Sequence, residues 1–295
     1  MFTSKMYIPT EKLKDWIKVF WFLEGSGNGK LSYTRNILPD GCATITFVLQ
    51  GNMDLSIYKN SIIKRGIYII PPVVNAHYDL ISDDIFLIDI QLNPSIFYKL
   101  FNLPVNELEN RIYTFEELSL NFDKSILDKI NEVKDDKNAI YLLLNNFFIN
   151  LFDKLKFYSD EIILSINQLY KNGNLDDFFN SQSLSIRQIE RKVKNYTGLT
   201  PQNISRLGRF YSVLEYMKFR QFNIEYCELA LEHKFSDQSH FIREFKSFTK
   251  FTPKNFIKDM NDFPQFKGLC NITKIINWFF IFQPSYNVTL NLLKL

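Results

Sequence analysis

The chain has 295 residues, of which 46% are hydrophobic and 23% are charged, and its formal net charge at pH 7 is +3. This composition is typical of a globular protein and excludes disordered, collagen-like and fibrous chains. The length corresponds to about two domains, each large enough to bury a core of its own.

The sequence favours a reducing, cytoplasmic location. The three cysteines, Cys42, Cys227 and Cys270, are scattered and lack CxxC spacing, which argues against a disulfide framework. The first residues contain no apolar core typical of a signal peptide. The apolar stretch 272–282 is interrupted by polar residues and is shorter than the roughly 20 residues that span a bilayer. We therefore expect a cytoplasmic protein that does not use a membrane as a partner.

Residues 16–92 contain short runs rich in Ile, Val, Phe, Tyr and Thr that are separated by turn residues. This pattern predicts an antiparallel β-sandwich or small barrel. The glycine-rich segment 25–29 lies between two runs and does not open onto a helix, which predicts a hairpin loop. The sandwich interior could hold a small ligand or be an ordinary aromatic core, and its expected lining is Trp21, Phe22, Phe47, Tyr68, His77 and Tyr78.

From Pro94 onward the hydrophobic period changes, and segments 94–102, 116–132 and 138–158 are predicted to be helical. In the third segment the apolar residues form one wide stripe. The stripe either covers the sheet or pairs with its copy in a second chain, so helix 138–158 is a candidate homodimer contact. The stripe consists of Ile140, Leu144, Phe147, Phe148, Leu151 and Leu155.

The next part of the chain is basic and repetitive. Residues 170–260 carry a net charge of +5, which suits a polyanion, although a solvated basic face explains the charge as well. Within this segment, residues 191–201 align with residues 243–253 at an offset of 52, with matching Arg, Lys, Thr, Thr and Pro. Each repeat is predicted to contain two short helices, and the second helix begins at Ser185 or, in the other repeat, at Ser236 or Asp237.

The second helix of each repeat presents side chains of the kind that read base edges. Arg pairs with guanine, Gln with adenine, Glu with cytosine, and an apolar side chain contacts the thymine methyl group. A helix-turn-helix unit places such a helix in the major groove. The outward residues are Arg187, Gln188, Glu190 and Arg191 in the first unit and Gln238, Ser239, Ile242 and Arg243 in the second.

Residues 201–222 are predicted to form a linking helix between the two units. If this helix holds the reading helices about 34 Å apart, they meet successive major grooves on one face of DNA. A protein-binding helical array is the alternative, but two repeats are too few for a stable solenoid. The buried side of the linking helix is expected to contain Ile204, Leu207, Val213, Leu214 and Met217.

The stretch FSDQSHFIREFK (235–246), followed by Thr252 and Pro253, resembles the DNA-binding domain of AraC/XylS-type transcriptional regulators. The first unit resembles the same family through LSIRQIER (184–191) and TGLTP (197–201). The resemblance implies that His240 helps to hold the domain together. It also implies DNA contacts by Arg187, Gln188, Glu190, Arg191, Lys194, Arg206, Arg209, Gln238, Ser239, Ile242, Arg243 and Lys246.

The sequence departs from the family pattern at three positions. Phe178 stands where the family usually has a small residue, so the first unit is expected to be repacked. Lys234 and Lys250 replace turn glycines, and a left-handed conformation costs lysine more than glycine. These changes put the fine geometry of the two units in question.

The N-terminal part resembles, less closely, a sensor domain found in some family members. The resemblance rests on residues 7–9, on residues 16–21 and above all on the sequence LPDGC at 38–42. It implies that this domain binds a small-molecule effector or a second subunit. The expected fold is α+β with two domains: a cupin-like β sandwich with packed helices at 1–160, an all-α domain of two helix-turn-helix units at 161–262, and a tail at 263–295.

The sequence gives little support for catalysis, a metal site or a cofactor. His77, His233 and His240 form no HxH or HxxxH pair, and neither a GxSxG elbow nor a P-loop is present. The adjacent acids at 83–84 and 116–117 are paired carboxylates, but adjacent acids are more often solvated or start a helix. We therefore expect a protein that is not an enzyme.

Three functions remain open at this point. The first is a regulator that binds promoter DNA, responds to an effector, and contacts RNA polymerase if it is an activator. The second is an architectural or docking module whose N-terminal domain binds a protein. The third is an enzyme of the DNA-repair type with a fused helix-turn-helix domain, for which Cys42 is the candidate nucleophile in the sensor half.

Overall fold

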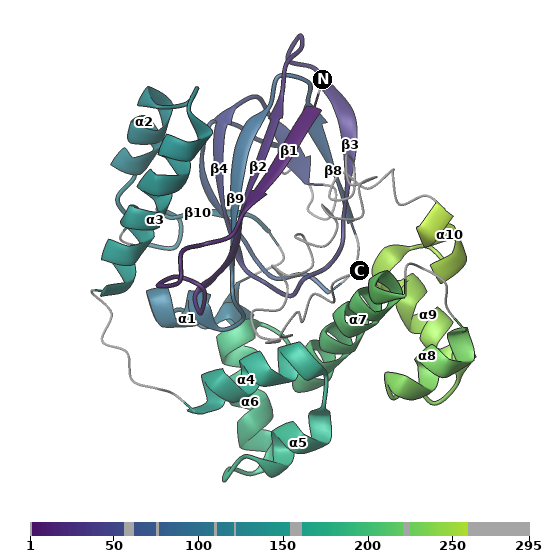
Figure 1. Cartoon of the computed structure of the whole chain (residues 1–295). Coiled ribbons are helices and arrows are strands. Elements are labelled where there is room, and N and C mark those ends of the chain that lie inside the picture. Colours follow the sequence, from purple (N-terminus) through teal and green to yellow (C-terminus); the bar gives the residue numbers. More distant parts are fainter. Residues whose placement is uncertain are drawn as a thin grey trace, which may run out of the picture.

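The computed structural model describes residues 2–55, 62–74, 77–108, 111–120, 122–153, 161–220 and 225–258. Figure 1 shows an N-terminal β-sandwich flanked by helices and a helical C-terminal part, which confirms the expected α+β fold. The predicted boundary at residue 160 and the predicted tail at 263–295 lie outside the described residues, so the domain limits stay a prediction. None of the helices in the described ranges has the length and apolar character needed to cross a membrane.

The N-terminal part consists of two antiparallel sheets. The larger sheet has the strand order β1-β2-β9-β4-β7-β10, and the smaller sheet has the order β3-β8-β5-β6. The strands are β1 (Phe2–Tyr7), β2 (Ile17–Gly25), β3 (Leu31–Ile37), β4 (Thr44–Gln50), β5 (Met53–Leu55), β6 (Ile62–Ile63), β7 (Gly66–Ile70), β8 (His77–Ser82), β9 (Phe86–Leu92) and β10 (Tyr113–Thr114).

Both faces of the larger sheet are covered, so its central strands are apolar on both sides. Phe22 of β2 and Phe47 of β4 pack with the helices, whereas the next residues, Leu23 and Val48, pack between the two sheets. Phe22 and Phe47 therefore do not line the sandwich interior, and that part of the expected lining is wrong. Of the other expected residues, Trp21 and Tyr68 lie on the interior side, and the side chains of His77 and Tyr78 are outside the described set.

The helices that follow the strands differ in extent from the prediction. Helix α2 begins at residue 125, not 116, because residues 113–114 form β10 and the next residues form a turn. In that turn, a Glu117 carboxylate oxygen accepts a hydrogen bond from the Thr114 N–H at 2.7 Å. The elements of this region are α1 (Ile96–Phe101), the 3-10 turn η1 (Val105–Glu107), α2 (Ser125–Glu132) and α3 (Lys137–Asp153).

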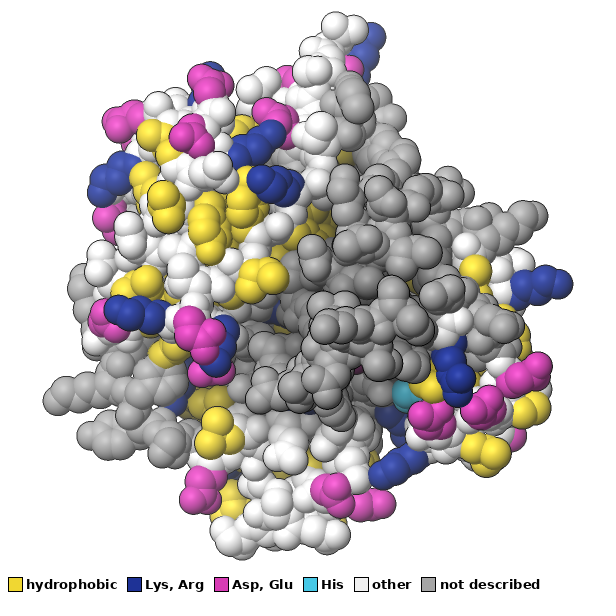
Figure 2. Space-filling model, in the orientation of Figure 1, with side chains coloured by type: hydrophobic (Ala, Val, Ile, Leu, Met, Phe, Trp, Pro, Cys, Tyr) yellow, Lys and Arg dark blue, Asp and Glu magenta, His cyan; other side chains and the backbone are white. Residues whose placement is uncertain are grey.

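The predicted apolar stripe of α3 packs against the larger sheet of the same chain. Ile140, Leu144 and Phe148 are all fully buried against the larger sheet. The opposite side of α3 carries Leu142, which is 58% exposed, and Figure 2 shows hydrophobic side chains gathered on this side of the sandwich. Homodimerisation through this helix therefore stays a prediction, and it would have to use the outer face.

The glycine-rich segment 25–29 is not a hairpin loop, contrary to expectation. Strands β2 and β3 belong to different sheets, so the segment crosses from one sheet to the other. The Asp83 carboxylate accepts hydrogen bonds from the backbone N–H groups of Asn28 and Gly29 at 2.8 and 2.6 Å. These donors lower the pKa of Asp83, because they stabilise its charged form.

The C-terminal part is helical. The linking helix α7 ends at residue 219, and its expected apolar residues are all buried. Gly208 lets α7 approach α4 closely, since a Cβ there would lie 2.8 Å from the backbone oxygens of Leu169 and Tyr170. The helices are α4 (Glu161–Asn172), α5 (Leu175–Asn180), α6 (Ile186–Thr197), α7 (Pro201–Phe219), α8 (Tyr226–Glu232), α9 (Gln238–Thr249) and α10 (Pro253–Lys258).

The sequence repeat is preserved in three dimensions. Helices α6 and α9 are both 12 residues long and start 52 residues apart. The Thr197 and Thr249 hydroxyls each donate to the backbone oxygen four residues earlier, at 2.8 and 2.9 Å. The paired inward residues Ile189 and Phe241 are each 1% exposed. Helices α6 and α9 are therefore equivalent structural units, and both pack against α7, which connects the two repeats (Figure 1).

The departures from the family pattern are accommodated locally. Lys234 and Lys250 adopt left-handed conformations with φ of 58° and 68°. Gly198, which is equivalent to Lys250 in the repeat, has φ of 73°. Phe178 and its counterpart Ala230 are both buried, so the first unit contains the larger side chain within its core. The lysines keep the turn geometry of glycine at a cost in backbone strain.

Candidate nucleic-acid interface

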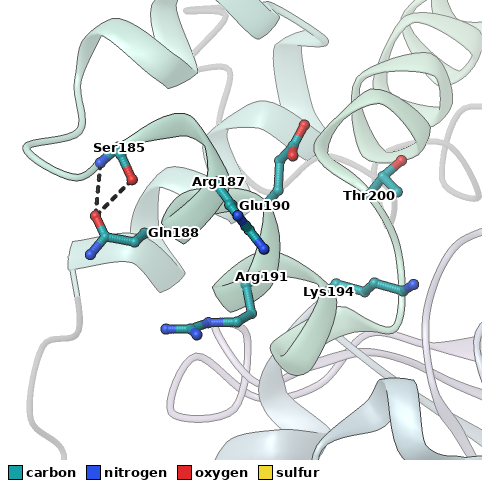
Figure 3. Close-up of a pocket in the computed structure, with 7 residues that line it drawn as sticks. All are labelled: Ser185, Arg187, Gln188, Glu190, Arg191, Lys194 and Thr200. Atoms are coloured by element: carbon teal, nitrogen blue, oxygen red, sulfur yellow. Dashed lines mark hydrogen bonds between the residues drawn. The ribbon is translucent and has the colours of Figure 1, made fainter.

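The outward face of α6 brings together residues that the sequence assigned to base reading. Arg187, Arg191 and Lys194 are exposed, and Glu190 is half-buried. With Thr200 they line an open hollow of about 760 Å³, and Figure 3 shows how their side chains project from α6. A concave surface with three cations and one acid is suited to a polyanion whose bases are read by hydrogen bonds.

Gln188 has a structural role that the sequence did not indicate. Its side-chain oxygen accepts hydrogen bonds from the backbone N–H and the hydroxyl of Ser185, at 3.0 and 2.8 Å (Figure 3). These bonds hold the N-terminus of α6. Gln188 would have to give up this cap to pair with adenine, so its base-reading role stays a prediction.

Helix α9 presents a similar set of exposed polar and basic side chains. Ser239, Arg243 and Lys246 are exposed, whereas Ile242 is half-buried against the C-terminal core. The helix begins at Asp237, whose carboxylate accepts a hydrogen bond from the His240 N–H at 2.7 Å. This bond lowers the pKa of Asp237, so the cap is charged at neutral pH.

Gln238 at the start of α9 is in contact with α8. Its side-chain oxygen accepts a hydrogen bond from the Cys227 Sγ at 3.2 Å. The side chain is half-buried, and its amide nitrogen is the group left to face a base edge. The sequence did not indicate this partner, because Cys227 lies on the preceding helix.

Arg206 and Arg209 bind within the protein. Arg206 Nε and an Arg209 terminal nitrogen each lie 3.2 Å from the Glu244 carboxylate. Glu244 is 6% exposed, and the two arginines are 36% and 23% exposed. The sequence feature that could have predicted this cluster is Glu244, an acid on the apolar face of α9 beside Phe241 and Phe245. The two arginines join α7 to α9, and direct DNA contacts by them stay a prediction.

Helix α6 also contacts the N-terminal part. The rings of Tyr98 in α1 and Tyr196 in α6 are stacked with centroids 4.3 Å apart. Gly198 at the end of α6 lies against Val105 of η1, where a Cβ would approach the valine Cγ1 to 2.9 Å. The position of α6 is therefore set by both parts of the molecule.

The chemistry of Cys42 does not suit a nucleophile. Its side chain is 3% exposed, and burial raises the pKa of the thiol to about 12. A thiol with such a pKa is protonated at neutral pH, whereas nucleophilic cysteines require the thiolate. In the described ranges, no group of three His, Cys, Asp or Glu side chains could hold a metal ion.

The second acid pair of the sequence also has structural partners. Glu116 forms an ion pair with Lys124, and Glu117 forms one with Arg111 at 3.1 Å. All four side chains are substantially exposed. These carboxylates therefore have ion-pair partners on the surface near β10.

Comparisons with known proteins gave one family model, which matches the N-terminal part, and several solved structures of low similarity. Residues 5–114 match a family model described as a domain of unknown function, DUF6597. A search of curated proteins gave no match. Three solved structures illustrate the similarity that the fold search found.

ToxT from Vibrio cholerae O395 is 15% identical, with a TM-score of 0.42, and the match covers 87% of this chain and 97% of that one. ToxT of strain SCE256 bound to an unsaturated fatty acid is 14% identical, with a TM-score of 0.39 and coverage of 87% and 94%. The AraC-like transcriptional activator CuxR is 10% identical, with a TM-score of 0.31 and coverage of 83% and 91%. At these values the likeness assigns neither a function nor a ligand to this chain.

Proposed function

We propose that this protein is a sequence-specific DNA-binding transcription regulator. The observation that carries the proposal is the pair of equivalent helices α6 and α9, each with exposed cations, which both pack against α7. In this proposal α6 and α9 enter successive major grooves on one face of the duplex.

The repeat pairs side chains that would have the same role in each groove. Arg191 and Arg243 occupy equivalent positions, as do Lys194 and Lys246. An Arg at the first of these positions is suited to bidentate contact with guanine, which contributes about 1–3 kcal/mol of discrimination. The lysines are suited to phosphate contacts, which add affinity without sequence preference.

The two units are expected to read different sequences. At the equivalent outward positions, Arg187 corresponds to Ser239, and Glu190 corresponds to Ile242. A carboxylate that accepts from cytosine and an apolar side chain against a thymine methyl favour different base pairs. The operator is therefore expected to consist of two dissimilar half-sites, not a palindrome within one protein chain.

The remaining partners follow from the same proposal. Promoter DNA is the primary partner, the N-terminal sandwich receives a small-molecule effector, and RNA polymerase is a partner if the protein activates transcription. A homodimer would use the N-terminal part, and the cytoplasm would be the working compartment.

The proposal is tested by binding of the full-length protein to the DNA upstream of its own gene, against a shuffled duplex, over a range of salt concentrations. Arg191→Ala and Arg243→Ala should each weaken binding to the preferred fragment about 10- to 100-fold and leave binding to the shuffled duplex less affected. Lys134→Ala, an exposed lysine beyond α2, is the control and should leave both unchanged. Equal losses on both duplexes would contradict base reading by these helices.

A further inference from the structure

A loop between the sandwich strands β3 and β4, residues 38–43, belongs to the core of the C-terminal part. Leu38 and Cys42 are 6% and 3% exposed and lie in the same hydrophobic cluster as Tyr170, Leu207 and Tyr211. The loop is thus part of the core that α4 and α7 form. We refer to it as the 38–43 loop.

Buried hydrogen bonds fix this loop to the helices. The Tyr170 hydroxyl donates to the Asp40 backbone oxygen at 2.6 Å, and the Tyr211 hydroxyl donates to the Pro39 backbone oxygen at 3.0 Å. Lys18 of β2 donates to the Tyr170 hydroxyl at 2.8 Å. Burial raises the pKa of both tyrosines well above the usual range, so both hydroxyls keep the proton that they donate.

Gly41 gives the closest approach. It has φ of +67°, and a Cβ at this position would lie 2.7 Å from a Leu207 methyl carbon and 3.1 Å from a Leu199 methyl carbon. Leu207 is in α7, and Leu199 is in the turn between α6 and α7. A displacement of the 38–43 loop would therefore push directly on Leu199, just beyond the C-terminal end of α6.

The other side of the same loop is the wall of a cavity in the sandwich. The cavity has a volume of about 50 Å³, and Leu38, Asp40 and Cys42 line it together with Trp21, Asp89 and Gln91. This is room for about four water-sized groups, since one such group needs roughly 10–15 Å³ on this measure. The loop is thus shared between a cavity and the helical core.

The β9 wall of this cavity presents two hydrogen-bond acceptors, the Asp89 carboxylate and the Gln91 side-chain oxygen. Asp89 and Gln91 are two residues apart on β9, so both face the interior. Asp89 is 4% exposed and accepts a hydrogen bond from the Thr46 hydroxyl at 2.7 Å. The Gln91 side-chain oxygen is buried and has no hydrogen-bond partner among the described residues. A buried acceptor of this kind costs free energy until a donor reaches it.

We propose that this cavity binds a small molecule with hydroxyl or ammonium donors, and that the 38–43 loop transmits its occupancy to α7 and α6. The donors of the ligand would satisfy Gln91 and approach the Asp89 carboxylate, while Trp21 supplies apolar contact. A molecule that fits without enlarging the cavity has about three to five non-hydrogen atoms. The ligand assignment stands on the cavity, and the transmission step rests on the proposed DNA-binding function.

The first test measures binding to the full-length protein by calorimetry, without DNA. Ethylene glycol and ethanolamine are the donor probes, and acetate, which has acceptor oxygens only, is the probe of similar size. The proposal expects saturable binding of at least one donor probe and none of acetate. Failure of both donor probes to bind, or equal binding of acetate, would overturn the ligand assignment.

A pair of variants locates the site. Gln91→Leu removes the buried acceptor and should weaken donor-probe binding about 10-fold, while raising the midpoint of unfolding of the unliganded protein. Gln50→Leu, at an exposed position of β4, should change neither property. A loss of probe binding in both variants, or in neither, would contradict a site at Gln91.

The transmission step is tested with the probe that binds. It should change the affinity of the full-length protein for its preferred DNA about fivefold or more. Tyr211→Phe removes the hydroxyl bound to Pro39 and should keep probe binding while reducing this change. An unchanged effect in Tyr211→Phe, or DNA binding that ignores the probe, would overturn transmission through the loop. A protein that binds the probe but no DNA would refute the regulator proposal and leave the ligand site standing.

Discussion

Arg209 and Glu244 are joined across two helices, with a guanidinium nitrogen 3.2 Å from a carboxylate oxygen. Arg206 contacts the same carboxylate from the same helix. Since α7 and α9 contribute the two sides of this cluster, it fixes α9 on α7. The orientation of α9 is therefore determined by an ion cluster as well as by the phenylalanine core.

Neutralising Glu244 should loosen this connection. Glu244→Gln leaves two partly buried arginines without their anion, and we expect a loss of about 2 kcal/mol of unfolding free energy, between the values for exposed and fully buried pairs. Glu232→Gln, at an exposed position of α8, should change stability by less than about 0.5 kcal/mol. Denaturant titration of both variants measures the difference, and equal stabilities would show that the cluster is not stabilising.

Backbone strain at Lys250 should be relieved by glycine. Lys250 has φ of 68°, and a left-handed residue other than glycine costs about 1–2 kcal/mol, part of which glycine loses again as entropy. We expect Lys250→Gly to raise the unfolding free energy by about 0.5–1 kcal/mol. Lys192→Gly, within the regular part of α6, should lower it by about 1 kcal/mol. If both changes destabilised the protein equally in urea, the strain at Lys250 would be refuted.

Much of the helical part was predictable, because its signals are local. The caps at Ser185 and Asp237, the inward residues Ile189 and Phe241, and the 52-residue offset all lie within one repeat, and the structure has them as expected. The hydrogen bonds between Ser185 and Gln188 are just as local, but they were not predicted from the sequence. A glutamine at this position is as suited to capping the helix as to contacting a base, so the sequence does not distinguish the two roles.

The failures of prediction have non-local causes. Phe22 and Phe47 were assigned to the sandwich interior, because strands covered on both faces lose the alternation that marks an inward side. The 38–43 loop was predicted only as a motif leading into a strand. Its partner Tyr211 lies 172 residues beyond Pro39, a separation that no periodicity in the sequence reveals.

The contact at Gly41 should be sensitive to a single methyl group. Gly41→Ala combines an unfavourable φ with a clash against Leu207, whereas Gly29→Ala has a similar φ of 78° and no contact closer than 3.4 Å. We expect Gly41→Ala to destabilise the protein by about 1–3 kcal/mol more than Gly29→Ala, which is the usual cost of overpacking. Equal effects in thermal and denaturant unfolding would show that the loop does not pack on α7 as described.

The two described cysteines should differ in reactivity. Cys227 is exposed, whereas burial raises the pKa of Cys42 from 9.0 to about 12. Because the fraction of thiolate falls tenfold for each pH unit below the pKa, Cys42 should react with iodoacetamide at pH 8 about 1,000-fold more slowly than an ordinary thiol. The reactivity of Cys42 should rise with pH up to about 12, and denaturation should remove the protection. Mass spectrometry of labelled peptides measures both sites, and rapid labelling of native Cys42 would restore the nucleophile hypothesis.

The most direct test of the account is a hydroxyl-radical footprint of the full-length protein on its preferred DNA fragment, with wild-type protein and with Arg191→Ala and Arg243→Ala. If α6 and α9 read successive major grooves, the wild type should protect two regions about one helical turn apart on one face of the duplex. Each variant should then lose protection mainly in its own region. A single protected region, or equal loss of both regions in both variants, would contradict the two-groove arrangement on which the proposed function rests.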